Sequence, residues 1–273
     1  MKLSALVCAQ NDEAQLADCL RGLEFCDEIV VVADRCTDRT QDIARQFGAR
    51  VIDGIFPLEN YRKAAGVASC LGEWILEVEP DERVDAKLAY EIRAAIHGRP
   101  AGDWFDVPVH NYLGSTLVRR GWGGGFGATL SPKLFRRHVK HWSAARIAAP
   151  TTMRGRRAGG LETPLIRQAE ADIGQWIARL DRQSWLRAQD LAEVGAPHSL
   201  PRAVLHGLRQ FAACYLWRHG VREGAAGFLI ALMAGLEPVL AALRTREILG
   251  ARRAAAAVPS AANTQPARLG RTG

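Results

Sequence analysis

The stretch Trp74-Ile75-Leu76-Glu77-Val78-Glu79-Pro80-Asp81-Glu82 decides how the whole chain is interpreted, because an apolar run ends there in a group of carboxylates. The apolar residues predict a buried β-strand. Pro80 predicts the end of that strand, because proline lacks the N–H that a sheet ladder needs. Four closely spaced carboxylates repel one another strongly where water is excluded. We therefore expect a divalent cation or a set of basic partners beside them, unless the turn is simply solvated.

The residues before this stretch alternate between strand patterns and helix patterns. Strands are predicted at residues 3–8, 28–32 and 50–52. A helix with apolar positions at Leu16, Cys19, Leu20 and Leu23 follows the first strand. A helix that carries Ile43, Ala44 and Phe47 follows the second, and a helix at about residues 61–71 follows the third. This alternation predicts an α/β fold with a doubly wound, mostly parallel sheet and helices on both faces. The carboxyl ends of parallel strands form the ligand crevice of such a sheet. The acidic turn therefore lies where a binding site is expected, and its oxygen ligands suit Mg²⁺ or Mn²⁺ shared with substrate phosphates.

The composition narrows the classes of function. At 273 residues, with 48% hydrophobic and 24% charged residues, the chain can hold one large α/β domain with a helical appendage and a tail. The first strand-to-helix turn, residues 9–13, contains no glycine, which argues against dinucleotide oxidoreductases, ATPases and sugar-nucleotide pyrophosphorylases. A net charge of +7 favours an anionic substrate or membrane surface. Dispersed arginines without a zinc-finger or RNP pattern predict no nucleic-acid partner.

The six cysteines form no C-x-x-C pair, and residues 1–2 lead directly into the first predicted strand. We therefore expect a reduced, cytoplasmic compartment and no secretory signal peptide.

The C-terminal third is predicted to be helical. Amphipathic helices are expected at residues 172–194 and 205–216. Residues 224–236 carry no charge, Glu237-Pro238 is expected to interrupt the helix, and residues 239–243 resume it. This uncharged run is shorter than the about 20 residues that a bilayer span needs. Two interpretations remain: an interfacial helix flanked by arginines on an anionic leaflet, or a hairpin packed on the preceding domain. A disordered tail is expected over residues 251–273.

Several short motifs occur in a characteristic order, and together they resemble the family 2 glycosyltransferases, in particular the lipopolysaccharide-core biosynthesis glycosyltransferases. The motifs are Ala9-Gln10-Asn11-Asp12-Glu13, Asp34-Arg35-Cys36-Thr37-Asp38, Lys63 before Gly66, Gly72-Glu73-Trp74-Ile75-Leu76, and Glu79-Pro80-Asp81-Glu82. The resemblance is strong over residues 3–99 and weaker at residues 111–123, 134–137 and 172–243. It implies a GT-A sheet over residues 1–168 and a helical region over residues 169–250.

The resemblance also implies roles for donor-binding residues. Asn11 and Asp12 would lie beside the nucleoside, Asp34 would contact the base, and Lys63 would lie near the donor. Structural alternatives exist: Asn11 and Asp12 could cap the first helix, and Lys63 could be a surface lysine.

The acidic motif would correspond to the D-x-D motif of the family. Asp81 would bind Mg²⁺ or Mn²⁺, and Glu79, which replaces an aspartate, would contact the ribose or the metal. Glu77 could support the metal site from a neighbouring position or pair with an arginine from the helix above the sheet, and the ion pair is expected. Burial of Asp81 in an ion pair, or its orientation away from any cavity large enough for a nucleotide, would count against the glycosyltransferase function itself.

The implied activity is an inverting, metal-dependent transfer of a sugar from a UDP- or GDP-linked donor. The acceptor would be a glycan or lipid-linked precursor of lipopolysaccharide or another cell-surface polysaccharide, at the cytoplasmic face of the inner membrane. The alternative is a catalytically degenerate protein that binds a glycan precursor or serves as a scaffold.

The catalytic base stays unassigned, because Ala148 and Arg167 stand where the family has other residues. Asp106, Glu162 and Glu170 are candidates by residue type. The glycine-rich residues 123–127 are expected to form a mobile lid.

Overall fold

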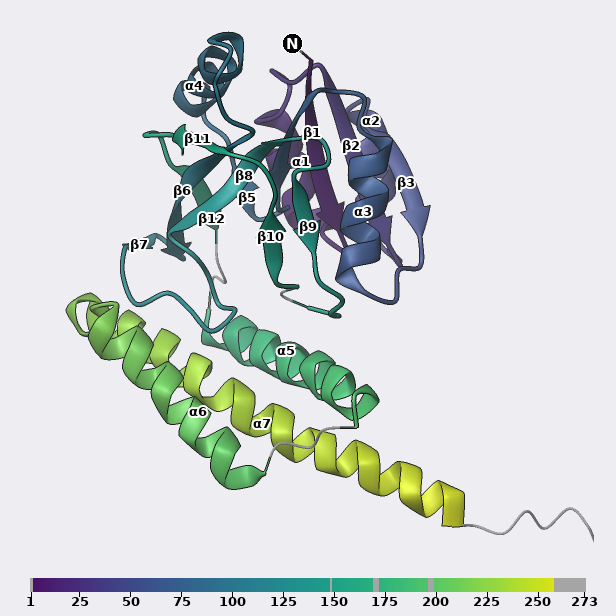
Figure 1. The fold of residues 1–273 in the computed structure, drawn as a ribbon, viewed down its shortest axis with the longest axis vertical. Helices are drawn as coiled ribbons and strands as arrows, with labels where there is room; N and C mark the ends of the chain where they lie inside the picture. The colour runs from purple at the N-terminus through teal and green to yellow at the C-terminus, as the bar shows by residue number, and fades with distance from the viewer. Residues whose placement is uncertain (1, 148, 169–171, 196–198, 258–273) are drawn as a thin grey trace, which may run out of the picture.

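The computed structural model of the chain describes residues 2–147, 149–168, 172–195 and 199–257 (Figure 1). Within these residues the main sheet has ten strands, eight of them in the order β3-β2-β1-β4-β8-β6-β12-β5, while β7 and β11 pair with β6. The strands are β1 (Leu3–Ala9), β2 (Glu28–Asp34), β3 (Arg50–Gly54), β4 (Trp74–Val78), β5 (Glu82–Arg83), β6 (Trp104–Leu113), β7 (Thr116–Val118), β8 (Leu130–Arg136), β11 (Arg157–Gly160) and β12 (Leu165–Gln168). A separate ribbon consists of β9 (Lys140–Trp142) and β10 (Thr151–Met153).

The parallel half of the sheet is built from the predicted strand and helix alternation. Strands β3, β2, β1 and β4 are parallel, and they are connected by α1 (Glu13–Arg21), α2 (Thr40–Gln46) and α3 (Glu59–Ser69). Strand β8 is antiparallel to both β4 and β6, while β12 is parallel to β6. The predicted mostly parallel α/β sheet is therefore confirmed, with an antiparallel strand inserted beside β4.

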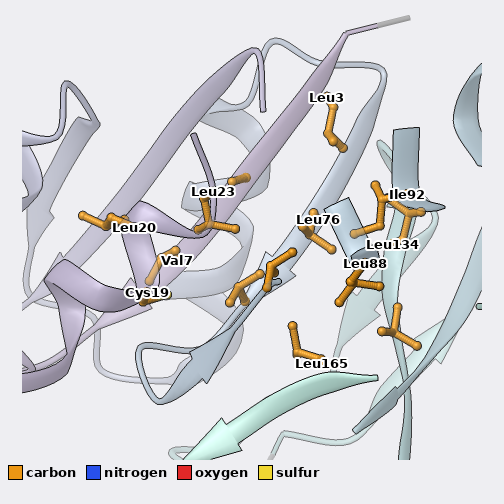
Figure 2. Packing of buried hydrophobic residues seen from close by; sticks show 14 of the residues in the cluster. Leu3, Val7, Cys19, Leu20, Leu23, Leu76, Leu88, Ile92, Leu134 and Leu165 are labelled. Atoms are coloured by element: carbon orange, nitrogen blue, oxygen red, sulfur yellow. The ribbon is translucent and has the colours of Figure 1, made fainter. Parts of the chain in front are cut away.

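Both faces of the sheet are covered, because alternate residues of each strand point to opposite sides. On one face Leu3, Val7 and Leu76 pack against α1, α2 and α4 (Ala86–His97), and Figure 2 shows them with Leu88 and Ile92 of α4. On the other face, Leu6 and its neighbours pack against α3 and the β9–β10 ribbon. The prediction of helices on both faces is confirmed.

Gly72 allows the backbone before β4 to approach β1 closely. Its N–H donates to the Ser4 hydroxyl at 2.7 Å. A Cβ atom at this position would lie 2.7 Å from the Ser4 nitrogen and 2.9 Å from the Trp74 carbonyl oxygen. The glycine of the Gly72-Glu73-Trp74 motif therefore has a packing role that sets where β4 enters the sheet.

The C-terminal helices are α5 (Ile173–Glu193), α6 (Leu200–Ala212), a π-helical turn (Ala213–Trp217), a 3₁₀ turn (Gly220–Glu223) and α7 (Gly224–Ala257). Helix α7 packs against both α5 and α6. The predicted interruption at Glu237-Pro238 is wrong: α7 passes through Pro238 without a break. Proline removes one backbone hydrogen bond, but packing against α5 and α6 holds the helix on both sides of it.

Helix α7 is also longer than the sequence predicts. It continues past residue 251 to Ala257, so the tail expected from residue 251 begins later, and residues 258–273 lie outside the described part. One helical segment, Gly220–Ala255, is long and apolar enough to cross a membrane by length and composition, although half of its most apolar window is buried within the chain. The uncharged run thus belongs to a helix that is long enough to span a bilayer. Buried core helices of soluble proteins can have the same length and composition.

The glycine-rich segment joins the sheet to the helices. Phe126 is fully buried and stacks on Trp176 of α5, with ring centroids 5.5 Å apart. The Gly125 carbonyl accepts hydrogen bonds from Arg179 at 3.0 Å and Gln183 at 3.2 Å. The segment expected to be a mobile lid is therefore docked on α5 in this structure.

We expect Gly72→Ala to lower the free energy of unfolding by about 1 to 3 kcal/mol, because the backbone atoms that the new methyl group meets cannot rotate away. Urea denaturation would measure it. The matched control is Gly250→Ala on an open face of α7, which should raise stability by up to about 1 kcal/mol through helix propensity. Equal effects of the two substitutions would contradict the close approach at Gly72.

Candidate functional site

A cavity of about 310 Å³ lies at the carboxyl end of β4, where the acidic turn begins. This volume is at the lower end of the range typical of small-molecule sites. Charged side chains of both signs line it: Glu59, Glu77, Glu79 and Glu82 with Lys63, Lys133, Lys140 and Arg167. Gly125, Gly127 and Ala128 of the docked segment form another part of the wall, together with Trp142.

Glu77 lies at the base of the cavity between two lysines. Its carboxylate is 2.5 Å from Lys63 Nζ of α3 and 2.6 Å from Lys140 Nζ of β9, and all three side chains are buried. Burial alone would raise the pKa of Glu77, but Lys140 and Lys63 outweigh it and hold the pKa well below its ordinary value. The expected ion pair exists, but the expected arginine partner is wrong. The sheet brings two lysines to this carboxylate instead.

Lys133 of β8 holds the next part of the acidic turn. Its Nζ lies 2.8 Å from a carboxylate oxygen of Glu82 and 3.8 Å from one of Glu79. Burial disfavours the charged lysine, yet Glu82 and Glu79 raise its pKa overall. Lys133 therefore stays protonated and presents a positive charge at the cavity wall.

Arg167 of β12 joins the two carboxylates predicted to bind a metal ion. Its Nε donates to Asp81 Oδ2 at 2.8 Å, and its Nη2 lies 3.0 Å from Glu79 Oε2. Strand β12 pairs antiparallel with β5, with Arg167 opposite Glu82, and this register places the guanidinium beside the acidic turn. The positive charge of Lys133, and to a smaller extent that of Arg167, lowers the pKa of Glu79. Burial instead raises the pKa of Asp81.

The predicted binding of Mg²⁺ or Mn²⁺ by Asp81 and Glu79 therefore meets a competing cation, because the Arg167 guanidinium already pairs with both carboxylates. Asp81 Oδ1 is buried without a hydrogen-bond partner and could accept a ligand. However, Arg167 already pairs with both carboxylates, so a divalent ion bound between them would lie beside a group of the same charge sign or would have to displace it. Among the described residues, no group of three or more His, Cys, Asp and Glu side chains could hold a metal ion. The residues do not fit a metal ion while Arg167 occupies this position.

Asn11 and Asp12 lie in the loop after β1 and are outside the cavity lining. Asn11 has a positive φ of 58°, and its Oδ1 accepts a hydrogen bond from the Thr37 N–H at 2.8 Å. Asp12 is the N-cap residue of α1, but its side chain makes no capping hydrogen bond and accepts from the Gln10 N–H instead. Asp12 therefore stabilises its own loop, whereas Asn11 connects this loop to the one after β2.

Asp34 ends β2 and is almost fully buried. Arg35 binds its carboxylate through Nε at 3.0 Å and Nη2 at 2.9 Å, and the Phe56 N–H donates to Oδ1 at 3.0 Å. Of the six predicted donor-binding residues, the structure brings Lys63 and Glu79 into the cavity wall, whereas Asn11, Asp12, Asp34 and Asp81 do not line it.

The candidate bases named by residue type do not line the cavity either. Asp106 pairs with Arg157 at 2.7 Å, and Glu162 is exposed to solvent. Glu170 lies outside the described residues. The carboxylates that line the cavity instead are Glu59, Glu77, Glu79 and Glu82.

Sequence reasoning missed Lys133, Lys140, Glu59 and Trp142 as cavity residues. Ser131 and Lys133 are two residues apart in β8 and therefore point to the same face of the sheet. This spacing, next to the apolar Leu134 and Phe135, could have indicated a strand with polar side chains on one face. Nothing in the sequence links this strand to the acidic turn, because β8 follows β4 by about 50 residues.

We expect Glu77→Gln to lower the free energy of unfolding by about 3 to 5 kcal/mol, because it leaves Lys63 and Lys140 buried without a countercharge. Glu24→Gln at an exposed position should change it by less than about 0.5 kcal/mol. Since the pKa of Glu77 is lowered on folding, its stabilisation is complete above about pH 4.5, the ordinary glutamate value, and is lost as the pH falls further. Denaturation at several pH values would measure both effects, and an unaffected Glu77→Gln variant would contradict the role of the lysines.

Comparison with known proteins is consistent with the sequence resemblance. No protein-family model matches the chain. An uncharacterized glycosyltransferase of Rickettsia felis is 34% identical over 94 residues, which cover 33% of this chain and 32% of the relative. The lipopolysaccharide core biosynthesis glycosyltransferase LpsC of Rhizobium meliloti is 33% identical over 97 residues, which cover 32% of this chain and 34% of LpsC. The alignments thus span about a third of the length of these curated relatives.

The fold has a counterpart among solved structures. The crystal structure of S. aureus TarS 1-349 in complex with UDP-GlcNAc matches with a TM-score of 0.50 at 13% identity, covering 93% of this chain and 92% of that chain. At this identity the likeness concerns the fold. The chain is therefore a sequence relative of bacterial glycosyltransferases, including one of lipopolysaccharide core biosynthesis, and it has a fold of the GT-A glycosyltransferase type.

Proposed function

We propose that the chain is an inverting glycosyltransferase that moves a sugar from a UDP- or GDP-linked donor to a glycan or glycolipid acceptor of lipopolysaccharide or another cell-surface polysaccharide. In this proposal residues 1–168 form the catalytic domain, and residues 169–250 form a helical region that contacts the membrane. Transfer would take place on the cytoplasmic side. The observation that carries the proposal is the cavity lined by Lys63, Lys133, Lys140 and Arg167 at the carboxyl edge of a GT-A type sheet.

This cavity suits a nucleoside diphosphate. Four cationic side chains line its wall, and the carboxylates that balance them already hold them in place. A diphosphate accepts charge-assisted hydrogen bonds from such groups without requiring them to reorganise. UDP-GlcNAc bound to S. aureus TarS, which shares the fold, supports a nucleotide-sugar as the ligand class.

In the proposed reaction, negative charge develops on the phosphate oxygen that leaves the anomeric carbon. The acceptor oxygen forms a bond to the anomeric carbon while the bond from that carbon to the donor phosphate oxygen breaks. The electron pair passes to the phosphate oxygen, and the acceptor proton passes to a base. Lys133 and Arg167 would stabilise the phosphate charge in the transition state. For the base, the carboxylates that line the cavity are better placed than Asp106 and Glu162.

The helical region supports an acceptor at a membrane surface. Large apolar side chains are exposed along α6 and the π-helical turn that follows it, among them Leu205, Leu208 (62% exposed) and Trp217 (69% exposed). Exposed arginines such as Arg209 and Arg222 lie nearby in the chain. An apolar face flanked by arginines suits an anionic leaflet.

One observation favours the alternative of a catalytically degenerate glycan-precursor binding or scaffold protein: Arg167 already engages Asp81, which the family resemblance assigns to the metal. The two functions differ in turnover. Incubation with UDP- and GDP-sugars and membrane extract would release nucleoside diphosphate if the chain is an enzyme, whereas a scaffold would release none.

We expect UDP or GDP to bind, and Lys133→Met combined with Glu82→Gln to weaken binding about tenfold or more. The double substitution removes a buried cation together with its countercharge, and a charge-assisted hydrogen bond contributes about 1.5 to 3 kcal/mol. Isothermal titration calorimetry, with and without Mg²⁺ or Mn²⁺, would measure it. The matched control is Arg136→Met combined with Glu73→Gln, an ion pair at the outer end of the same strand, which should not change affinity. Failure of both nucleotides to bind under every condition would overturn the proposed function.

We expect the chain to sediment with vesicles rich in phosphatidylglycerol and not with pure phosphatidylcholine vesicles. Leu208→Glu should weaken vesicle binding about tenfold or more, because burial of a leucine side chain contributes about 1.5 kcal/mol or more. Tyr90→Glu, at an exposed position of α4, is the control and should leave binding unchanged. Equal binding by the two variants would contradict the role of the α6–α7 hairpin.

A further inference from the structure

Strand pairing places Arg167 beside the acidic turn of the proposed donor site. Arg167 lies 86 residues after Asp81 in the chain. Two strand pairings bring them together: β12 lies between β6 and β5, with Arg167 opposite Asn111 on one side and Glu82 on the other. The Gln168 N–H also donates to the Asp81 carbonyl at 2.8 Å. The backbone of Arg167 is therefore fixed by pairing on both sides of β12, and its guanidinium extends from a strand and not from a loop.

The contacts of Arg167 correspond to those expected of a metal ion. One cation reaches both Asp81 Oδ2 and Glu79 Oε2, at 2.8 and 3.0 Å, and the same side chain lines the cavity. A guanidinium has five N–H donors in a plane, so it can hold two carboxylates and still donate to a phosphate oxygen. Its charge is permanent, because arginine does not lose its proton in proteins.

Charge balance agrees with this assignment. The four carboxylates of the acidic turn each have a basic partner within 4 Å, and those partners are Lys63, Lys133, Lys140 and Arg167. Each carboxylate of the acidic turn therefore has a basic partner without a metal ion.

We propose that Arg167 takes the place of the divalent metal ion in this chain, so that donor binding and sugar transfer require neither Mg²⁺ nor Mn²⁺. The inference rests on the proposed function and deepens it. Arg167 donates to the diphosphate, and together with Lys133 it stabilises the charge on the departing phosphate oxygen when its bond to the anomeric carbon breaks. Glu79 and Asp81 orient the guanidinium and bind no metal.

The test is calorimetric titration of the full chain with UDP and GDP, in excess EDTA and in excess Mn²⁺. The wild-type affinity is expected to agree within about twofold between the two conditions. Arg167→His replaces the guanidinium with a metal ligand beside two carboxylates. This variant is expected to bind the nucleotide at least tenfold more weakly in EDTA and to regain affinity with Mn²⁺.

Two controls separate this effect from loss of structure. Arg157→His, on β11, which pairs with β6 as β12 does, should leave affinity unchanged in both conditions. Arg167→Lys keeps the positive charge and should retain more affinity in EDTA than Arg167→His. Wild-type binding that appears only with Mn²⁺ would overturn this inference and leave the proposed function standing. Absence of nucleotide binding in every condition would overturn the proposed function, and the inference with it.

Discussion

The ion pairs between the acidic turn and four basic side chains are the interaction on which this structure depends. Buried charges are costly unless a countercharge and hydrogen bonds accompany them. Here the countercharges come from four separate elements: Lys63 from α3, Lys133 from β8, Lys140 from β9 and Arg167 from β12. The carboxylates therefore hold together parts of the fold that are distant in sequence. The same arrangement leaves cations at the wall of a cavity, where an anionic ligand could use them.

The sheet topology explains why the cavity lies where it does. Parallel strands bring their carboxyl ends to one edge, and β4 delivers Glu79 and Glu82 there. The antiparallel β8 and the short β5–β12 pairing then carry Lys133 and Arg167 to the same edge. The docked glycine-rich segment closes one side, because Phe126 is anchored on Trp176 while Gly125 lines the cavity. One short segment thus contacts both the site and the helical region.

Much of the fold could be predicted from the sequence because its pattern is local. Alternating strand and helix segments, a proline after residue 79 and a glycine before β4 are each visible within a few residues. The predicted helix interruption at Pro238 was wrong because it considered only the local effect of the proline. Packing of α7 against α5 and α6, which are separate helices, outweighs that local effect. Asn11 is another case, because its side chain accepts a hydrogen bond from the Thr37 N–H in the loop after β2. The location of Asn11 and Asp12 beside the nucleoside stays a prediction.

The sequence by itself determined that four carboxylates follow a buried strand and that a cation or a set of basic groups must balance them. Only the tertiary structure decided between these two, because the basic partners are distant in sequence. Arg167, for example, lies 86 residues after Asp81 and is joined to the turn by strand pairing. No local pattern can encode such a pairing, since its register depends on the packing of the whole sheet. The physical reason is that the repelling carboxylates are close together in the sequence, whereas the basic groups that balance them come from distant segments that only the fold brings close.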